Sequence, residues 1–153
     1  MKKLTFVLLI MLASAGVRAQ VAIAWINLPD SICPFLQEQQ RFTLLQYAKA
    51  GLKDSIENQF DGHSYIDSIN LTDGFIRAQI APNMTLELAT EAQIVAQEGD
   101  EAIAEDNNRV SITVCAPICS TITTWYDKNW KFLRREKQPW SIEQTEEEKL
   151  QHF

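Results

Sequence analysis

The segment Val110–Tyr126 constrains the fold more than any other part of the chain; its sequence is VSITVCAPICSTITTWY. β-Branched residues alternate with other residues on both sides of its centre, which is typical of a pleated strand with two unlike faces. Pro117 lies at the centre, where its restricted φ favours a turn, and it could not lie inside a central strand. The segment therefore predicts an antiparallel β-hairpin whose loop is Ala116–Ile118.

Closing this loop predicts three directly opposed pairs, which are Cys115 with Cys119, Thr113 with Thr121, and Ile112 with Ile122. Opposed Cβ atoms are about 4.5–5.5 Å apart and a disulfide needs about 3.5–4.5 Å, so a Cys115–Cys119 bridge requires only a slight tightening. The ring is small, so the bridge contributes about 2 kcal/mol through chain entropy. Its main effect is to hold the register, because a slip of one residue would exchange the two faces.

Residues 1–19 have the pattern of a secretory signal peptide, with two lysines at the start and an apolar run over 4–15. Small residues before Ala19 predict cleavage between Ala19 and Gln20, and cleavage after Ala15 is the alternative. The apolar run is shorter than the roughly 20 residues that a membrane span requires. The expected location is periplasmic or secreted, with no membrane span after cleavage.

Cleavage changes the charge of the chain, and with it the partners that we expect. The removed segment carries three basic residues and no acidic one, so the formal net charge moves from −6 to −9. An acidic domain repels nucleic acid and anionic membrane surfaces, so neither is an expected partner. Residues 20–153 suit a single domain with a polar C-terminal tail from about 134 to 153.

Three cysteines leave one without a partner if Cys115 pairs with Cys119. The remaining one, Cys33, is expected to be free, as a small buried apolar residue. The alternatives are a pairing with a hairpin cysteine or an intermolecular bridge.

The first half of the chain predicts helices. They are expected at Val21–Asn27, 31–36 and Gln39–Leu52, with a continuation over 53–60. The second half predicts a three-stranded meander at Ser64–Leu71, Phe75–Ile80 and from Met84 to Leu88, before the main hairpin. Residues 89–108 are either a loose hairpin extension or a short helix. A last strand is expected at Trp130–Leu133, Trp140 is expected to pack on the body, and a terminal helix is expected from Ser141 to Leu150.

Together these elements predict an α+β fold, with N-terminal helices packed on an antiparallel β-sheet that consists of a meander plus the cystine-tipped hairpin.

The chain lacks the usual catalytic and cofactor motifs. Its two histidines, His63 and His152, match no zinc spacing, and there is no nucleophile elbow or phosphate-binding glycine loop. The two hairpin cysteines do not lie at a helix N-terminus, where a thiolate would be stabilised. We therefore predict no catalytic, metal-binding or cofactor-binding residue and no cofactor. Paired carboxylates stay open, because sequence does not give their separation in space.

Four segments carry a resemblance to a known family, and they occur in the order Leu28–Ser31, Thr72–Phe75, Val114–Cys119 and Tyr126–Trp130. Over 28–133 the chain resembles a domain-of-unknown-function family of small exported, periplasmic proteins from Bacteroidales. It differs from that pattern at Ala116, where glycine is usual, and in a longer 89–108 region. The family has no assigned activity, so the resemblance implies no catalytic residue.

The resemblance also implies a modification. Bacteria of that group attach O-glycans to exported proteins at Asp-Ser or Asp-Thr followed by an apolar residue, and this pattern occurs at Ser31, Ser55 and Ser68. The tripeptide is short and arises by chance, and a helix cap or a strand residue explains Ser31 and Ser68 equally well.

The expected function is a non-enzymatic periplasmic binding or interaction domain with an unknown protein or glycan partner. Its candidate recognition face consists of Thr113, Thr121, Thr123 and Trp125, although an antiparallel sheet commonly leaves one face to solvent in any case. The alternative is a small periplasmic hydrolase or thiol-active enzyme that uses carboxylates or the pair Cys115 and Cys119.

Overall fold

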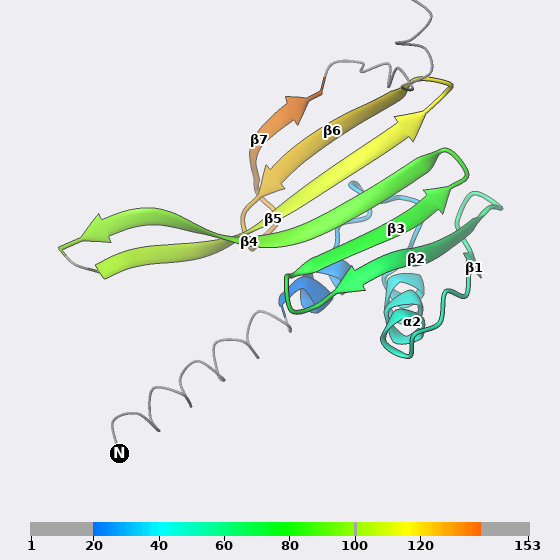
Figure 1. Cartoon of the computed structure of the whole chain (residues 1–153), viewed down its shortest axis with the longest axis horizontal. Coiled ribbons are helices and arrows are strands. Elements are labelled where there is room, and N and C mark those ends of the chain that lie inside the picture. Colours follow the sequence, from blue (N-terminus) through cyan, green and yellow to red (C-terminus); the bar gives the residue numbers. More distant parts are fainter. Residues whose placement is uncertain (1–19, 100, 139–153) are drawn as a thin grey trace, which may run out of the picture.

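The computed structural model describes residues 20–99 and 101–138. They form one seven-stranded antiparallel sheet whose strands follow one another in chain order (Figure 1). The strands are β1 (Ile56–Glu57), β2 (His63–Asn70), β3 (Phe75–Ala81), β4 (Met84–Glu98), β5 (Glu101–Cys115), β6 (Cys119–Tyr126) and β7 (Phe132–Lys137). The helices of the described residues are a first helix over 20–26 and α2 (Glu38–Lys49).

The predicted α+β class is wrong, because this is a β-rich fold with two short helices in its described residues. Residues 31–36 form turns instead of a helix, since Pro34 removes a backbone donor there. α2 ends at Lys49, just before Gly51, whose φ is 75°. The predicted continuation over 53–60 contains β1 instead, because Ile56 pairs with Ser64.

The predicted meander and hairpin are confirmed. Residues 84–98 and 101–115 form one long hairpin, so the hairpin extension predicted for 89–108 is correct and the short helix is not. At the other end of β5, the three predicted pairs are all present in the register of β5 and β6. Cys115 and Cys119 form a disulfide, with 3.9 Å between their Cα atoms.

The helices and one face of the sheet bury a shared apolar core. On β3, Ile76, Ala78 and Ile80 are buried in alternation, as a strand with one covered face requires. They belong to the same buried cluster as Trp25 of the first helix and Leu44 of α2. Burying each large apolar side chain contributes about 1.5–3 kcal/mol, so the helices are held by this face of the sheet.

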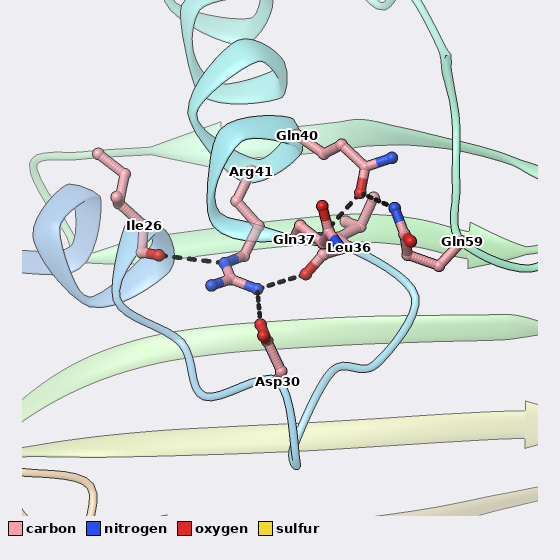
Figure 2. A network of polar contacts seen from close by, with 7 residues as sticks. All are labelled: Ile26, Asp30, Leu36, Gln37, Gln40, Arg41 and Gln59. Atoms are coloured by element: carbon pink, nitrogen blue, oxygen red, sulfur yellow. Dashed lines mark hydrogen bonds and ion pairs between the residues drawn. The ribbon is translucent and has the colours of Figure 1, made fainter.

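Arg41 ties the first helix and α2 to the segment between them, and its side chain is only 3% exposed. Its Nε donates to the carbonyl of Ile26 at 3.1 Å, and its Nη1 donates to Asp30 Oδ1 at 3.1 Å and to the carbonyl of Leu36 (Figure 2). The Trp25 indole in turn donates to the Arg41 carbonyl at 2.8 Å. These bonds satisfy a buried charge and hold the turns of 27–36 in place.

The outer half of the β4–β5 hairpin extends past its neighbours. The β3 ladder ends where Phe75 pairs with Ala89, and the β6 ladder begins where Tyr126 pairs with Asn108. Residues 90–98 and 101–107 therefore form a two-stranded ribbon, which we name the arm. Figure 1 shows the arm projecting beyond the other strands on the left of the view.

Among the described residues the last strand is β7, later than the predicted Trp130–Leu133, so residues 134–137 of the predicted tail lie in a strand. The signal peptide with Ala19, the packing of Trp140, the terminal helix from Ser141 and His152 lie outside the described residues. Among residues 20–99 and 101–138, no helix is long and apolar enough to cross a membrane.

Candidate functional site

A cleft of about 380 Å³ lies at the base of the arm, and we name it the arm-base cleft. Three parts of the chain meet there, which are the first helix, the neighbouring ends of the arm strands and the turn between β6 and β7. It is lined by Gln20, Ile23, Ala24, Asn27, Thr90, Asp106, Asn108, Lys128, Asn129 and Trp130. The volume is within the range of small-ligand sites in proteins.

The β6–β7 turn presents Trp130 to this cleft. Asp127 organises the turn, because its Oδ1 accepts hydrogen bonds from the backbone N–H groups of Asn129 at 2.8 Å and Lys131 at 2.9 Å. Trp130 itself has φ of 64°, a left-handed conformation that is strained for a bulky residue. Its ring packs on Tyr126 with 5.6 Å between centroids, and this contact helps to hold the conformation.

The arm supplies polar groups to the opposite side of the cleft. Thr90 and Asn108 are directly opposed, and Asp106 follows on the same face of β5 because side chains alternate along a strand. Asn108 Nδ2 donates to the Asp127 carbonyl at 3.4 Å, which joins the arm base to the turn. The Asp106 carboxylate accepts a hydrogen bond from Gln20 Nε2, which joins it to the first helix.

A close approach of two strands supports this side of the cleft. The Thr90 N–H donates to the Gly74 carbonyl at 3.0 Å. A Cβ atom at Gly74, where φ is 68°, would lie 2.6 Å from Thr90 Oγ1. Only glycine fits there, since both the backbone conformation and the space exclude a side chain.

The lining of the cleft suits recognition by hydrogen bonds and ring contacts. It combines one carboxylate, one ammonium group and four side-chain amides with the ring of Trp130 and the apolar side chain of Ile23. Ile23 is 56% exposed, which makes the first helix an accessible wall. No group of three or more metal-ligating side chains occurs within the part of the chain that the structure describes.

The predicted recognition face lies elsewhere, on the sheet face opposite the helices. Its hydroxyls bond to other strand hydroxyls, Thr113 with Thr121 at 2.8 Å and Thr123 with Ser111 at 2.9 Å. Trp125 is 8% exposed, and the guanidinium of Arg134 lies 3.7 Å from its ring centroid. These groups already have partners, and a role for this face in recognition stays a prediction.

One hollow on that outer face includes Thr113, together with Asp67, Arg77, Gln79, Thr85 and Glu87, and has a volume of about 300 Å³. Both carboxylates there have cationic partners, because Arg77 pairs with Asp67 at 3.0 Å and with Glu87 at 3.8 Å, and Lys53 pairs with Asp67 at 3.6 Å. This arrangement neutralises the acids in a half-exposed position and leaves neither positioned as a lone general acid or base.

The cysteines occupy two different environments. Cys115 and Cys119 are bonded to each other at the hairpin tip, so neither pairs with Cys33. Cys33 is free and 2% exposed, next to the core. Burial raises the pKa of the Cys33 thiol above its ordinary value of 9.0, which keeps it a poor nucleophile at neutral pH.

The three serines of the predicted glycosylation pattern differ in accessibility. Ser31 and Ser55 are exposed and lie outside the strands, whereas Ser68 is half-buried in β2 beside Arg77. His63 is exposed at the start of β2 and lines, with Ser55, an open hollow of about 740 Å³.

Sequence reasoning missed the arm-base cleft. Gln20 and Asp106 are 86 residues apart, and their contact depends on how the first helix packs against the arm. The one available signal was the segment Tyr126–Trp130, where a turn-forming aspartate precedes an aromatic residue in a way that a plain hairpin turn does not require.

A comparison with protein families places this chain in a known group. The family described as "Protein of unknown function (DUF3256)" matches residues 14–151. The chain belongs to the DUF3256 family. The predicted membership in a domain-of-unknown-function family is thereby confirmed, and the match includes every residue that lines the arm-base cleft. No curated protein and no solved structure shows a significant match to this DUF3256 protein.

Proposed function

We propose that this DUF3256 protein is a non-enzymatic binding domain in the periplasm of a bacterium of the Bacteroidales type, and that the arm-base cleft is its ligand site. The observation that carries this proposal is Trp130, which lines the cleft in a left-handed conformation with φ of 64°. Strain of this kind costs about 1–3 kcal/mol and clusters at ligand sites, where it is retained because it places a side chain.

The composition of the cleft supports binding. Lys128 and Asn129 are exposed at its rim, and Trp130 offers a partly exposed ring beside them. A ring flanked by an ammonium group and amides is able to contact an apolar surface while bonding polar groups, as peptide and glycan sites require.

Two features favour binding over catalysis. The single carboxylate of the cleft, Asp106, accepts the Gln20 amide, whereas glycoside hydrolysis uses two carboxyl groups across the bond. The hairpin cysteines are oxidised and lie at the tip of β5 and β6, away from the arm. No observation favours the alternative hydrolase or thiol-active enzyme over binding.

Export is supported by the disulfide and by the sequence of residues 1–19. Disulfides persist in oxidising compartments and are rare in the reducing cytosol. If export occurs through a signal peptide that is cut before Gln20, the processed chain begins at the wall of the arm-base cleft.

The test uses the processed protein, purified from the periplasm of an expression host and screened against an array of synthetic peptides and an array of bacterial glycans. Ile23→Trp fills part of the cleft without changing its charge and should weaken binding of any captured ligand at least about tenfold. Leu133→Trp is the matched control, because Leu133 is 47% exposed on β7, outside the cleft.

Two results would contradict the proposal. Equal binding by the wild type and Ile23→Trp would show that the ligand binds outside the cleft. Turnover of a captured peptide or glycan, seen by mass spectrometry as a cleaved product, would make the protein an enzyme.

A further inference from the structure

We infer that the arm-base cleft takes an extended, basic polypeptide segment, which pairs as an additional strand with the outer edge of β5 over residues 102–106. This inference rests on the proposed function and names the class of partner for the same site. It follows from three observations, which are the direction of the backbone groups on the arm, the charge of the arm and the position of the cleft along it.

The register shows which backbone groups face outward from β5. Cys115 donates its N–H to the Asn83 carbonyl, on the β4 side. The register of the β4–β5 ladder shifts between Ile94 and Ala96, which adds a residue to β4 and none to β5. Because N–H and C=O directions alternate along a strand, the even-numbered residues of β5 point away from β4. Ala116, just beyond Cys115, follows this pattern, since its N–H donates to the Ile118 carbonyl on the β6 side at 3.2 Å.

The same alternation places the N–H and C=O groups of Ala102, Ala104 and Asp106 on the outer edge of the arm. Among residues 20–99 and 101–138, β6 reaches only to Asn108, and no strand pairs with this edge over 102–106. A two-stranded ribbon is marginally stable in water by itself, and an added strand stabilises it through main-chain hydrogen bonds.

The charge of the arm favours a basic partner. Between Thr90 and Asn108 the sequence has no lysine or arginine and has the acidic residues Glu91, Glu98, Asp100, Glu101, Glu105 and Asp106. Glu91 already pairs with Arg109 at 3.0 Å, so the other five carry the negative charge of this segment. Two such arms repel each other, because like charges on paired strands are destabilising, so a second copy of this chain is a poor occupant. A lysine-bearing or arginine-bearing strand complements this charge.

The cleft lies where the added strand would need a side-chain pocket. Directly opposed residues on paired strands point to the same face, so the residue opposite Asp106 directs its side chain toward the cleft. Asp106, Asn108 and Trp130 line that space, whose volume of about 380 Å³ accommodates one large side chain. Main-chain bonds along β5 supply affinity, and this pocket supplies selectivity.

The test uses a synthetic peptide of about nine residues, a length that covers 102–106 with an overhang at each end. Lysine and threonine alternate along it, with tyrosine at the centre. The readouts are calorimetric affinity and amide hydrogen exchange of the processed protein measured by NMR. We expect the peptide to slow exchange of the Ala102, Ala104 and Asp106 amides at least about tenfold.

Two proline variants separate the β5 edge from general damage to the arm. Ala104→Pro removes an outward N–H from β5, and edge strands tolerate proline where the N–H faces solvent. Ala92→Pro is the matched control on the β4 edge, where Thr90 directs its N–H outward to Gly74 and Ala92 repeats that direction. We expect Ala104→Pro to weaken peptide binding at least about tenfold and Ala92→Pro to leave it within about twofold.

Several outcomes would overturn the inference. The peptide could protect the amides of the β4 edge instead of the β5 edge, or bind equally well when glutamate replaces its lysines. The two proline variants could lose the same peptide affinity, or a dimer could protect the same amides without peptide. If Ile23→Trp abolishes binding of an array ligand while Ala104→Pro does not, this inference fails and the proposed function stands. If no array ligand depends on the cleft, the proposed function fails as well.

Discussion

The two ends of β5 differ, although they belong to one strand. At Cys115 the strand lies between β4 and β6 and is bonded to Cys119 through the disulfide. At Glu101 its ladder partner is on β4 alone among the described residues. The end with the Cys115–Cys119 disulfide therefore contributes to the stability of the fold, whereas the arm leaves backbone N–H and C=O groups of β5 available for pairing with another chain. Under the function proposed above, one continuous strand would serve stability at one end and recognition at the other.

The largest expected effect on stability is at Gly74, whose contact with Thr90 lies at the base of the arm. Gly74→Ala should destabilise the fold by about 2–4 kcal/mol, because it combines a disfavoured left-handed alanine with overpacking against Thr90. Chemical denaturation measures the change. The matched control is Gly99→Ala at the arm tip, where φ is 62° but no atom lies within 4 Å of the added Cβ. If Gly99→Ala destabilised the fold as much as Gly74→Ala, the contact with Thr90 would not explain the effect.

Removing the Cys115–Cys119 disulfide should have the next largest effect on stability. The double variant Cys115→Ser and Cys119→Ser should lose about 2 kcal/mol of unfolding free energy, because the bridge closes only a short ring. Reducing agent should lower the stability of the wild type by a similar amount and leave the double variant unchanged. Unchanged wild-type stability under reduction would show that the hairpin register is held by strand pairing alone.

The stability at alkaline pH should distinguish the free Cys33 from Cys115 and Cys119, which are bonded to each other. The pKa of Cys33 is raised by burial, so the folded state favours the neutral thiol. That contribution to stability is fully present below the unfolded pKa near 9.0 and is lost as pH rises through the folded value. We expect the wild type to lose more stability above pH 9.0 than Cys33→Ala does, measured by denaturation across pH. Parallel pH profiles of the two proteins would contradict this.

Shortening the arm should have the smallest effect on stability. If residues 92–106 are replaced by an Asn-Gly turn that joins Glu91 to Asn107, the opposed pair of these two residues is retained. We expect the unfolding free energy to change by less than about 1 kcal/mol, because the buried cluster has no member in the replaced segment among the residues whose side chains the structure describes. Binding of the basic peptide should be lost. A cooperative loss of several kcal/mol would show that the arm belongs to the folding core.

The mass of the native protein tests the predicted O-glycosylation of the three serines. If the O-glycan prediction is correct, native periplasmic protein should be heavier than recombinant protein, with the added mass on peptides that contain Ser31 or Ser55. Both serines are exposed, whereas Ser68 lies half-buried in β2. Mass spectrometry of the reduced protein decides this, and equal masses would remove the prediction.

Local periodicity predicted part of the fold well. The alternation in 110–126 predicted the register of the hairpin, and Pro117 predicted its loop, because both signals act between residues close in sequence. The helical continuation over 53–60 failed for the opposite reason. Its apolar spacing allowed a helix, but Ile56 gains a strand partner at Ser64 across the turn, and that pairing overrides a weak helical preference.

The arm and its cleft were harder to predict because their signals are weak or distant. The arm is rich in alanine, glutamate and glutamine, residues that do not favour strands, so its β-structure follows from continuing the register of β4 and β5. The strained backbone of Trp130 and the contact of Gln20 with Asp106 leave no periodic trace in the sequence.

The sequence by itself determined the hairpin, its disulfide, the meander and the acidic charge, because alternation, turn residues and charge are properties of neighbouring residues. Only the tertiary structure decided that the sheet dominates the helices, that β4 and β5 extend past their neighbours, and that the first helix meets the β6–β7 turn at the arm base. Those outcomes depend on side chains far apart in the chain finding a shared core, and a single sequence does not encode such distances in any local pattern.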